Sequence, residues 1–154
     1  MSFILRPYAA SDFGELLALD HACYPPGIAY SKIMFRWYLN APGAICLVSE
    51  GDAGEVPGFI LAESDPPNGH IITLDVAEKA RRRGLGTKLT VAVEAELSAH
   101  GVANIELETA TDNAAGVAFW MRHGYRTVGV IPRYYLDRID AYHMVKTLDA
   151  PKET

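Results

Sequence analysis

The chain has 154 residues and a formal net charge of −5, with 49% hydrophobic and 21% charged residues. These values are typical of one globular domain with a sizeable core. The negative charge argues against a nucleic-acid-binding protein, and the sequence has no apolar run of about 18 residues that would span a membrane. The N-terminus lacks a signal-peptide pattern, and Cys23 and Cys46 are too few for a disulfide framework, so we expect a cytoplasmic protein.

The N-terminal third of the chain predicts one strand and two helices. Phe3–Arg6 has the pattern of a short strand, and Ser11 is the expected N-cap of a helix over Asp12–Ala22. A Tyr-Pro-Pro-Gly sequence then breaks the chain, and Ser31 is expected to cap a second helix that ends at Leu39.

The rest of the chain alternates strands and helices, which predicts an α/β domain with a mixed sheet. Asp112 or Asn113 is the expected N-cap of the last helix, and Gly101 fits the end of the long helix before it. We take residues 1–148 as a single domain and 149–154 as a polar C-terminal tail. The expected strands are Ile45–Ser49, Gly58–Glu63, His70–Val76, Ile105–Thr109, Tyr125–Ile131 and Ala141–Lys146, and the long helix is Leu85–Ala99.

The turn at residues 81–87, Arg-Arg-Arg-Gly-Leu-Gly-Thr, joins an expected strand to the long helix. The first N–H groups of a helix have no intrahelical acceptor, and the helix dipole favours anions there. Glycines let the backbone approach a phosphate closely, and the three arginines add positive donors. The turn therefore predicts a site for a phosphorylated cofactor. The dinucleotide pattern G-x-G-x-x-G and the Walker pattern G-x-x-x-x-G-K-[ST] are both absent.

The same turn fits the pattern R/Q-x-x-G-x-G/A, with Arg81, Gly84 and Gly86 at its defining positions. It resembles the acetyl-CoA pyrophosphate loop of the GNAT superfamily of N-acetyltransferases, and the order of elements resembles that fold over nearly the whole chain. The resemblance implies a mixed, mostly antiparallel, splayed sheet with helices on both faces. It also implies that pantetheine bonds to the backbone of Leu74 and Val76. The pyrophosphate would then bind the turn formed by Arg81, Arg82, Arg83, Gly84, Leu85, Gly86 and Thr87.

A second motif lies between Asp112 and Tyr125, where an Asn-Ala-Ala helix ends in Gly-Tyr. This segment resembles the second cofactor motif of the superfamily, which implies that Asn113 and Trp120 lie at the cofactor. Many members carry at the position of Trp120 a Tyr that protonates the thiolate, and an indole N–H is not a usable acid. Tyr135 or water would then supply this proton.

Two aromatic segments resemble the acceptor site of protein N-terminal acetyltransferases, which include the RimI-type ribosomal-protein alanine enzymes and their eukaryotic relatives. One segment contains a Tyr-Tyr pair followed by Asp-Ala-x-x-Met, and the other is an aromatic-Pro loop between the first two helices. Amphipathic packing is the alternative reading of these tyrosines. The residues that the resemblance places at the acceptor are Tyr24, Pro25, Tyr30, Tyr134 and Tyr135.

Acetyl transfer to an amine needs a neutral amine, a polarised carbonyl and a proton for the thiolate. An α-amine has a pKa of about 8, so roughly a tenth is neutral at pH 7 and a weak or water-relayed base suffices. By resemblance, Glu108 falls where these enzymes carry a Glu or His base. His70 falls where some carry a Tyr that holds the relay water, and a His could also accept the proton itself. A solvated strand carboxylate and a turn histidine are the alternatives for these two residues.

The leading hypothesis is an acetyl-CoA-dependent N-acetyltransferase for a protein or peptide N-terminal α-amine. An enzyme for a small amine or a lysine side chain, and a non-catalytic acyl-CoA-binding module, stay open because acceptors are recognised by loops. The expected partners are acetyl-CoA and the acceptor amine, without a metal, nucleic acid or membrane. The chain would be a monomer or a homodimer.

Overall fold

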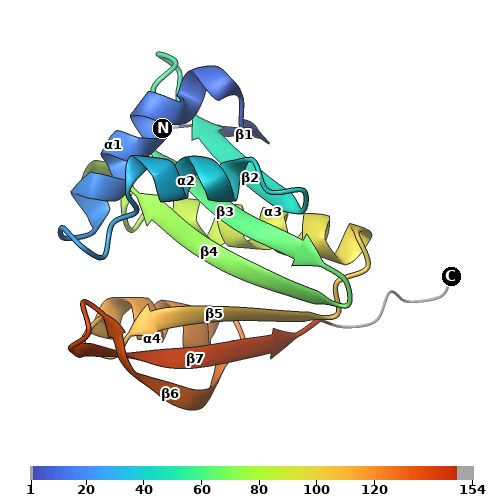
Figure 1. The fold of residues 1–154 in the computed structure, drawn as a ribbon. Helices are drawn as coiled ribbons and strands as arrows, with labels where there is room; N and C mark the ends of the chain where they lie inside the picture. The colour runs from blue at the N-terminus through green and yellow to red at the C-terminus, as the bar shows by residue number, and fades with distance from the viewer. Residues whose placement is uncertain (1, 149–154) are drawn as a thin grey trace, which may run out of the picture.

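The computed structural model describes residues 2–148, and the expected polar tail at 149–154 lies outside them. Within the described residues, seven strands form one sheet in the order β1-β2-β3-β4-β5-β7-β6 (Figure 1). β4 and β5 are parallel, and the other neighbouring strands are antiparallel. The strands are β1 Ile4–Pro7, β2 Ala44–Glu50, β3 Gly58–Asp65, β4 Asn68–Val76, β5 Asn104–Ala110, β6 Arg126–Tyr135 and β7 Ile139–Thr147. The helices are α1 Phe13–Cys23, α2 Lys32–Leu39, α3 Leu85–Ala99 and α4 Ala114–Arg122, with short 3-10 turns η1 Ala10–Asp12 and η2 Glu78–Ala80.

Helices cover both faces of this sheet, as expected, and Figure 1 shows α1 and α2 in front of it and α3 behind. Alternation along β3 explains the two layers, since successive side chains of a strand point to opposite faces. Phe59 and Leu61 pack with Leu16 and Phe35 on the α1–α2 side. Ile60 and Ala62 pack on the α3–α4 side with the buried stripe of α3, which consists of Leu85, Leu89, Val93 and Leu97.

The sheet opens between β4 and β5. Asn68–His70 pairs with Asn104–Glu106, and beyond this point the two strands diverge (Figure 1). β4 also carries an extra residue against β3, because Leu61 lies opposite Thr73 while Ala62 lies opposite Ile71. This β-bulge bends the strand at Ile72. The last residues of β4 therefore leave β5 and keep one backbone edge without a strand partner.

Side chains at the helix starts confirm two of the three predicted caps. Ser31 Oγ accepts a hydrogen bond from the Met34 N–H at 3.2 Å, and Asn113 Oδ1 accepts one from the Gly116 N–H at 3.1 Å. The predicted cap at Ser11 is wrong, because Ser11 lies inside η1 and α1 begins at Phe13.

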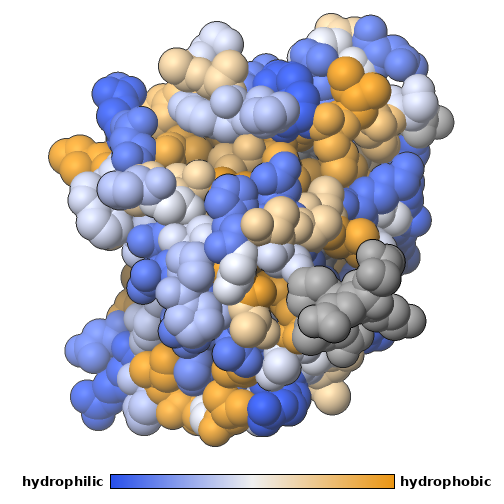
Figure 2. Space-filling model, turned by 90° about the vertical axis from the view of Figure 1, so that its right-hand side faces the viewer, coloured by the Kyte–Doolittle hydropathy of each residue, from blue (hydrophilic) through white to orange (hydrophobic). Residues whose placement is uncertain are grey.

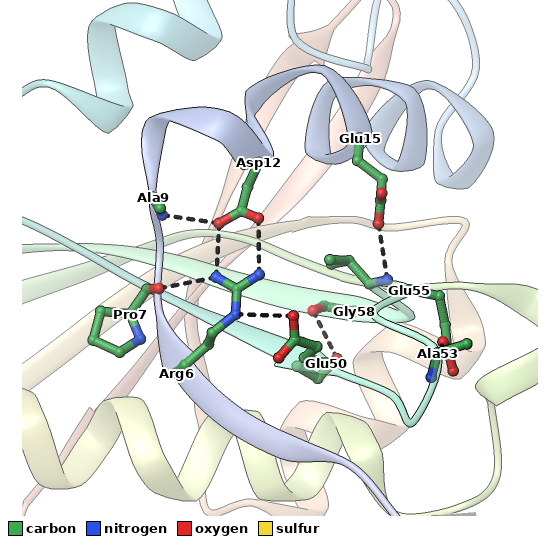
Figure 3. A network of polar contacts seen from close by, with 11 residues as sticks. Arg6, Pro7, Ala9, Asp12, Glu15, Glu50, Ala53, Glu55 and Gly58 are labelled. Carbon is green, nitrogen blue, oxygen red and sulfur yellow. Dashed lines mark hydrogen bonds and ion pairs between the residues drawn. The ribbon is translucent and has the colours of Figure 1, made fainter.

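The start of α1 is fixed by Asp12 instead (Figure 3). Its Oδ2 accepts a hydrogen bond from the Ala9 N–H at 2.9 Å, and both carboxylate oxygens accept from the Arg6 guanidinium at 2.8 Å. The Arg6 Nε also lies 3.6 Å from Glu50 Oε1. A carboxylate that binds an arginine through both oxygens fixes the start of a helix more strongly than a serine hydroxyl does. The buried Asp12 therefore sets the chain direction from β1 into α1.

The last two strands are longer than the sequence pattern predicts. β6 continues through Tyr135, so the tyrosine pair lies at the end of a strand and not in a loop. Leu136 and Asp137 then form the turn with φ values of 55° and 52°. On the side of the molecule drawn in Figure 2, hydrophobic residues form separate areas among hydrophilic ones. Among the described residues, no helix is long and apolar enough to cross a membrane.

Candidate active site

The turn before α3 has the features of an anion site. Gly84 precedes the helix with φ +77°, a left-handed conformation that glycine adopts without strain. The N–H groups of residues 85–87 donate no hydrogen bond within the described part of the chain, because a first helical turn has no internal acceptors for them. A Cβ at Gly84 would meet no atom within 4 Å, so backbone conformation, and not space, favours glycine there.

The three arginines of this turn have different surroundings. Arg81 Nε donates to the Val76 carbonyl at 3.0 Å, and its Nη2 lies 3.8 Å from Cys23 Sγ. This side chain therefore holds the turn against the end of β4. Arg82 and Arg83 are exposed. Direct binding of the pyrophosphate by the arginines stays a prediction, with Arg82 and Arg83 better placed for it than Arg81.

Tyrosines from the α1–α2 loop contact the open edge of β4. The Tyr24 hydroxyl donates to the Leu74 carbonyl at 3.1 Å, and the Tyr30 hydroxyl donates to the Ile72 carbonyl at 3.4 Å. Both carbonyls belong to the part of β4 that has left β5. The binding of a pantetheine arm to Leu74 and Val76 stays a prediction. This edge has no strand partner there, but the Leu74 carbonyl accepts from Tyr24 and the Val76 carbonyl from Arg81.

Glu108 and His70 form a close pair beside this opening. Glu108 Oε2 lies 2.6 Å from His70 Nε2, and the two side chains are 16% and 31% exposed. His70 lies opposite Glu106 in the short parallel pairing, so Glu108 is two residues further along the same face of β5. Burial lowers the pKa of His70, but the Glu108 carboxylate, with Glu106 and Glu63, raises it more, and the net pKa lies above its ordinary value of 6.5.

The predicted acceptor tyrosines meet in one groove of about 640 Å³ between the α1–α2 loop and the end of β6. Tyr24, Tyr30, Tyr134 and Tyr135 all line it. Pro25 does not, and its carbonyl instead accepts the N–H groups of Ile28 and Ala29 at 3.0 Å, which turns the loop. The other lining residues are His21, Pro26, Gly27, Ile28, Ala29, Ser31, Met34 and Tyr38.

Met34 and Tyr38 are residues of the groove that the sequence reasoning missed. They are four residues apart and therefore share one face of α2, and the Tyr38 ring packs edge-on against Tyr30 at 5.4 Å. The i, i+4 spacing directly after the aromatic loop was the signal that could have identified them.

The tyrosine pair keeps its protons at neutral pH. The rings of Tyr134 and Tyr135 meet edge to face at 4.8 Å. Burial and the Glu108 carboxylate raise the pKa of Tyr134 to about 12. Burial, with Tyr134 and Glu108, also raises the pKa of Tyr135. Both hydroxyls are therefore hydrogen-bond donors beside Glu108.

Trp120 and Asn113, which the resemblance placed at the cofactor, have structural contacts here. The Trp120 ring packs against Phe119 and Tyr125 at 4.9 and 5.3 Å in the core on the α3–α4 side. Asn113 caps α4, while Thr87 Oγ1 lies 3.0 Å from His123 Nε2 and links the anion turn to the end of that helix. Neither arrangement tests whether Trp120 and Asn113 touch the cofactor, so that stays a prediction.

Neither cysteine has the environment of a nucleophile. Cys23 and Cys46 are free thiols, and burial raises the pKa of both. Residues 2–148 contain no group of three or more His, Cys, Asp or Glu side chains that would hold a metal ion.

Comparison with known proteins places this site in a family. The Acetyltransferase (GNAT) family profile matches residues 13–125. The chain is 33% identical over 146 residues to an uncharacterised N-acetyltransferase of Methanocaldococcus jannaschii, which covers 93% of this chain and 90% of the relative. It is 31% identical to the N-terminal acetyltransferase complex ARD1 subunit homolog of Dictyostelium discoideum, over 92% of this chain and 71% of the relative.

Solved structures of other proteins have the same fold as this chain. The ribosomal-protein-S18-alanine N-acetyltransferase from Escherichia coli has a TM-score of 0.87 at 20% identity, with 99% of this chain and 98% of that chain covered. Ard1 from Thermoplasma volcanium has a TM-score of 0.88 at 22% identity, with 97% and 99% covered. The chain belongs to the GNAT family and is an N-acetyltransferase that uses acetyl-CoA. The free N–H groups at the start of α3 and the edge of β4 that has left β5 fit that cofactor.

Proposed function

We propose that the chain acetylates the α-amine of a protein or peptide N-terminus. The observation that carries this proposal is the tyrosine groove, whose residues Tyr134 and Tyr135 lie near enough to Glu108 for its charge to raise the pKa of both. Among the relatives, an N-alpha-acetyltransferase of Sulfurisphaera tokodaii is 26% identical over 157 residues, which supports the same acceptor class.

The groove is suited to the first residues of an extended peptide. Its walls are aromatic rings held in place by their own hydroxyl bonds, since Tyr24 and Tyr30 donate to carbonyls of β4. Rigid tyrosines provide a large contact area at a low cost in conformational entropy. Tyr134 and Tyr135 close the opposite side, and the Tyr134 hydroxyl donates to an acceptor group of the peptide backbone.

The His70–Glu108 pair removes the proton that the amine loses. In neutral His70 the Nε2–H donates to the Glu108 carboxylate, which leaves Nδ1 as the acceptor. The imidazolium that forms is stabilised by the carboxylate 2.6 Å away. Because an α-amine has a pKa of about 8, a base of this strength, acting directly or through one water, suffices at neutral pH.

Acetyl-CoA supplies the acetyl group as a thioester. The first N–H groups of α3 bind its phosphates, and the edge of β4 that has left β5 orients its arm toward His70 and Glu108. The departing thiolate takes its proton from water through the Tyr135 hydroxyl, which stays protonated because burial raises its pKa.

A matched set of acceptors tests this function. Acetyl-CoA and the protein are incubated with peptides that begin with Ala, Ser or Met and contain one internal lysine, and with the same peptides N-formylated. Free lysine and small amines form a third group, and thiol release and the mass of each product are measured. We expect acetylation of the free N-termini alone. Turnover with the formylated peptides or with small amines only would contradict the proposal, and cofactor binding without any turnover would indicate a non-catalytic module.

A further inference from the structure

Two carboxyl groups are buried beneath the acceptor groove and take no part in the mechanism above. Asp20 on α1 is 0% exposed and Asp75 on β4 is 1% exposed. One oxygen of each has a donor: Asp20 Oδ2 accepts from the Tyr30 N–H at 2.8 Å, and Asp75 Oδ1 accepts from the Thr73 hydroxyl at 2.6 Å. The other two oxygens, Asp20 Oδ1 and Asp75 Oδ2, are buried without a donor among the described residues.

The position of Asp75 follows from the bulge in β4. The extra residue at Ile72 turns Thr73 and Asp75 to the face on which Leu61 and Phe59 lie, and this face packs against α1. Both carboxyl groups are buried, and a side-chain hydrogen bond with Asp20 is among the contacts that act on Asp75. A lone buried carboxylate is very unfavourable, and two adjacent ones are more so.

The charged and titratable groups around the pair do not neutralise two negative charges. Arg81 is the cation whose charge acts on Asp75, and its Nε and Nη2 are directed to the Val76 carbonyl and to Cys23. The other groups facing the pair are thiols and phenols that are neutral at pH 7, because burial raises the pKa of each: Cys23, Tyr24, Tyr30 and Cys46. A proton between Asp20 Oδ1 and Asp75 Oδ2 satisfies both orphan oxygens and leaves one charge. In agreement, burial and the hydrogen bond with Asp20 raise the pKa of Asp75 well above its ordinary value.

We propose that Asp20 and Asp75 share one proton and that this pair positions the acceptor loop against the cofactor strand. The loop, residues 24–31, carries Tyr24 and Tyr30, and it is bound to α1 through the Tyr30 backbone. The Tyr30 N–H donates to Asp20, and the Tyr30 carbonyl lies 2.7 Å from His21 Nε2. The shared proton extends this contact to β4, so one hydrogen-bonded path runs from the groove wall to the strand edge that faces acetyl-CoA. Asp20 and Asp75 are thus positioning residues for the acceptor site of the proposed function.

The shared proton predicts how two substitutions of Asp20 change the binding of the acceptor peptide. In Asp20→Asn the amide oxygen still accepts from Tyr30 and the Nδ2 group donates to Asp75, so a fixed hydrogen bond replaces the shared proton. Asp20→Ala removes both contacts. We expect Asp20→Ala to raise the KM for the peptide about tenfold, the effect of one lost hydrogen bond. The KM for acetyl-CoA should stay close to the wild-type value, and Asp20→Asn should restore the peptide KM. An equal peptide KM in wild type and Asp20→Ala would contradict the positioning role.

A second measurement determines how many protons the chain releases on unfolding, and it does not depend on catalysis. Above the ordinary pKa of an aspartate the folded pair keeps a proton that both aspartates lack in the unfolded chain, so unfolding releases it and the chain becomes less stable as pH rises toward the raised pKa of Asp75. Asp20→Asn and Asp75→Asn should each release one proton fewer, measured from the pH dependence of the free energy of unfolding in urea. Asp12→Asn is the matched control, since Asp12 is also buried but ionised beside Arg6, and its slope over the same pH range should equal that of wild type. Equal slopes in all four proteins would overturn the shared proton.

The two measurements separate this proposal from the proposed function. If no peptide is acetylated, the kinetic comparison fails but the proton count still decides whether the pair exists. If peptides are acetylated and the proton count does not change in either amide variant, the function stands and the pair is wrong.

Discussion

Glu108 Oε2 lies 2.6 Å from Nε2 of His70, although the strands that carry these residues stop pairing at Glu106 and His70. The contact thus spans the beginning of the opening between β4 and β5. The carboxylate stabilises the imidazolium form of His70 and so raises the pKa of that residue. The basic step of amine acetylation then depends on the pair and not on His70 alone.

Glu108→Gln should lower kcat roughly a hundredfold at pH 7, because the His70 imidazolium loses its carboxylate partner. The loss should shrink as pH rises toward the pKa of the amine, where the acceptor is already neutral and needs less help from a base. Steady-state kinetics from pH 6 to 9 check this. Glu106→Gln is the comparison, since Glu106 also raises the pKa of His70 but contacts His143 at 3.3 Å, so its effect on kcat should be much smaller. A wild-type pH profile in Glu108→Gln would remove Glu108 from the mechanism.

The raised pKa of His70 predicts a pH dependence of stability. A group whose folded pKa is raised contributes stability that is fully present below its unfolded pKa, here about 6.5, and is lost as pH rises through the folded pKa. The difference in the free energy of unfolding between wild type and His70→Gln should therefore be largest at pH 5 to 6 and fall above it. Denaturant unfolding at several pH values measures this difference. A constant difference over the whole range would show that Glu108 does not raise the pKa of His70.

Gly84→Val should abolish acetyl-CoA binding in a chain that still folds. A β-branched residue at φ +77° costs about 1–2 kcal/mol, and relief of this strain would move the N–H groups away from the phosphates. Gly54→Val is a close control, because Gly54 has φ +82° and equally open surroundings, far along the chain in the β2–β3 turn. Calorimetric titration with acetyl-CoA should show binding to Gly54→Val and none to Gly84→Val. Equal affinity in both variants would refute the phosphate-binding turn.

Tyr135→Phe should reduce kcat roughly tenfold if its hydroxyl protonates the thiolate, with little change in the KM for acetyl-CoA. Tyr8→Phe is a suitable control, since Tyr8 is also half-buried but packs in the α1–α2 core and does not line the groove. An unchanged kcat in Tyr135→Phe, with a thiol that still leaves, would mean that water supplies the proton directly.

Asp12→Asn tests the contact at the start of α1. The Arg6 guanidinium lowers the pKa of Asp12 below 3.8, so the stability from this pair is present above that pH and is lost as pH falls through the folded pKa. We expect the variant to lose about 1–3 kcal/mol at pH 7, since one partner of a buried charged hydrogen bond is removed. The loss should diminish at pH 3, as measured by thermal unfolding. A loss of equal size at pH 3 and pH 7 would show that the charge of Asp12 is not involved.

The order of strands and helices could be predicted from the sequence because local signals determine it. The bounds of α3 match the predicted Leu85–Ala99, since its apolar stripe and Gly101 at φ +90° are both local features. Ser11 failed as a cap because its neighbour Asp12 makes an ion pair with Arg6 of the preceding strand, a contact that a helical pattern does not contain. The extension of β6 through Tyr135 depends in the same way on its pairing with Ile139, beyond the turn.

The parts of the candidate site that belong to sequence motifs could be predicted. The parts that depend on tertiary packing were missed. The anion turn and the four groove tyrosines were expected, and the structure brings the tyrosines together. Asp20 and Asp75 are 55 positions apart in sequence, and nothing in either segment indicates that they meet. Their approach depends on the bulge at Ile72, which changes the face of Asp75. A pattern of alternating residues cannot reveal one inserted position in a strand.

The short parallel contact between β4 and β5 has a mechanical consequence. Strands β1–β4 form one half-sheet and β5–β7 another, and in the sheet they are joined only along Asn68–His70 and Asn104–Glu106 of the described chain. A ligand that occupies the free edge of β4 acts as an eighth strand and cross-links the halves. Slow amide hydrogen exchange should then spread from β3 and β4 into β5 when acetyl-CoA is bound, which makes the cofactor part of the cooperative unit of the fold.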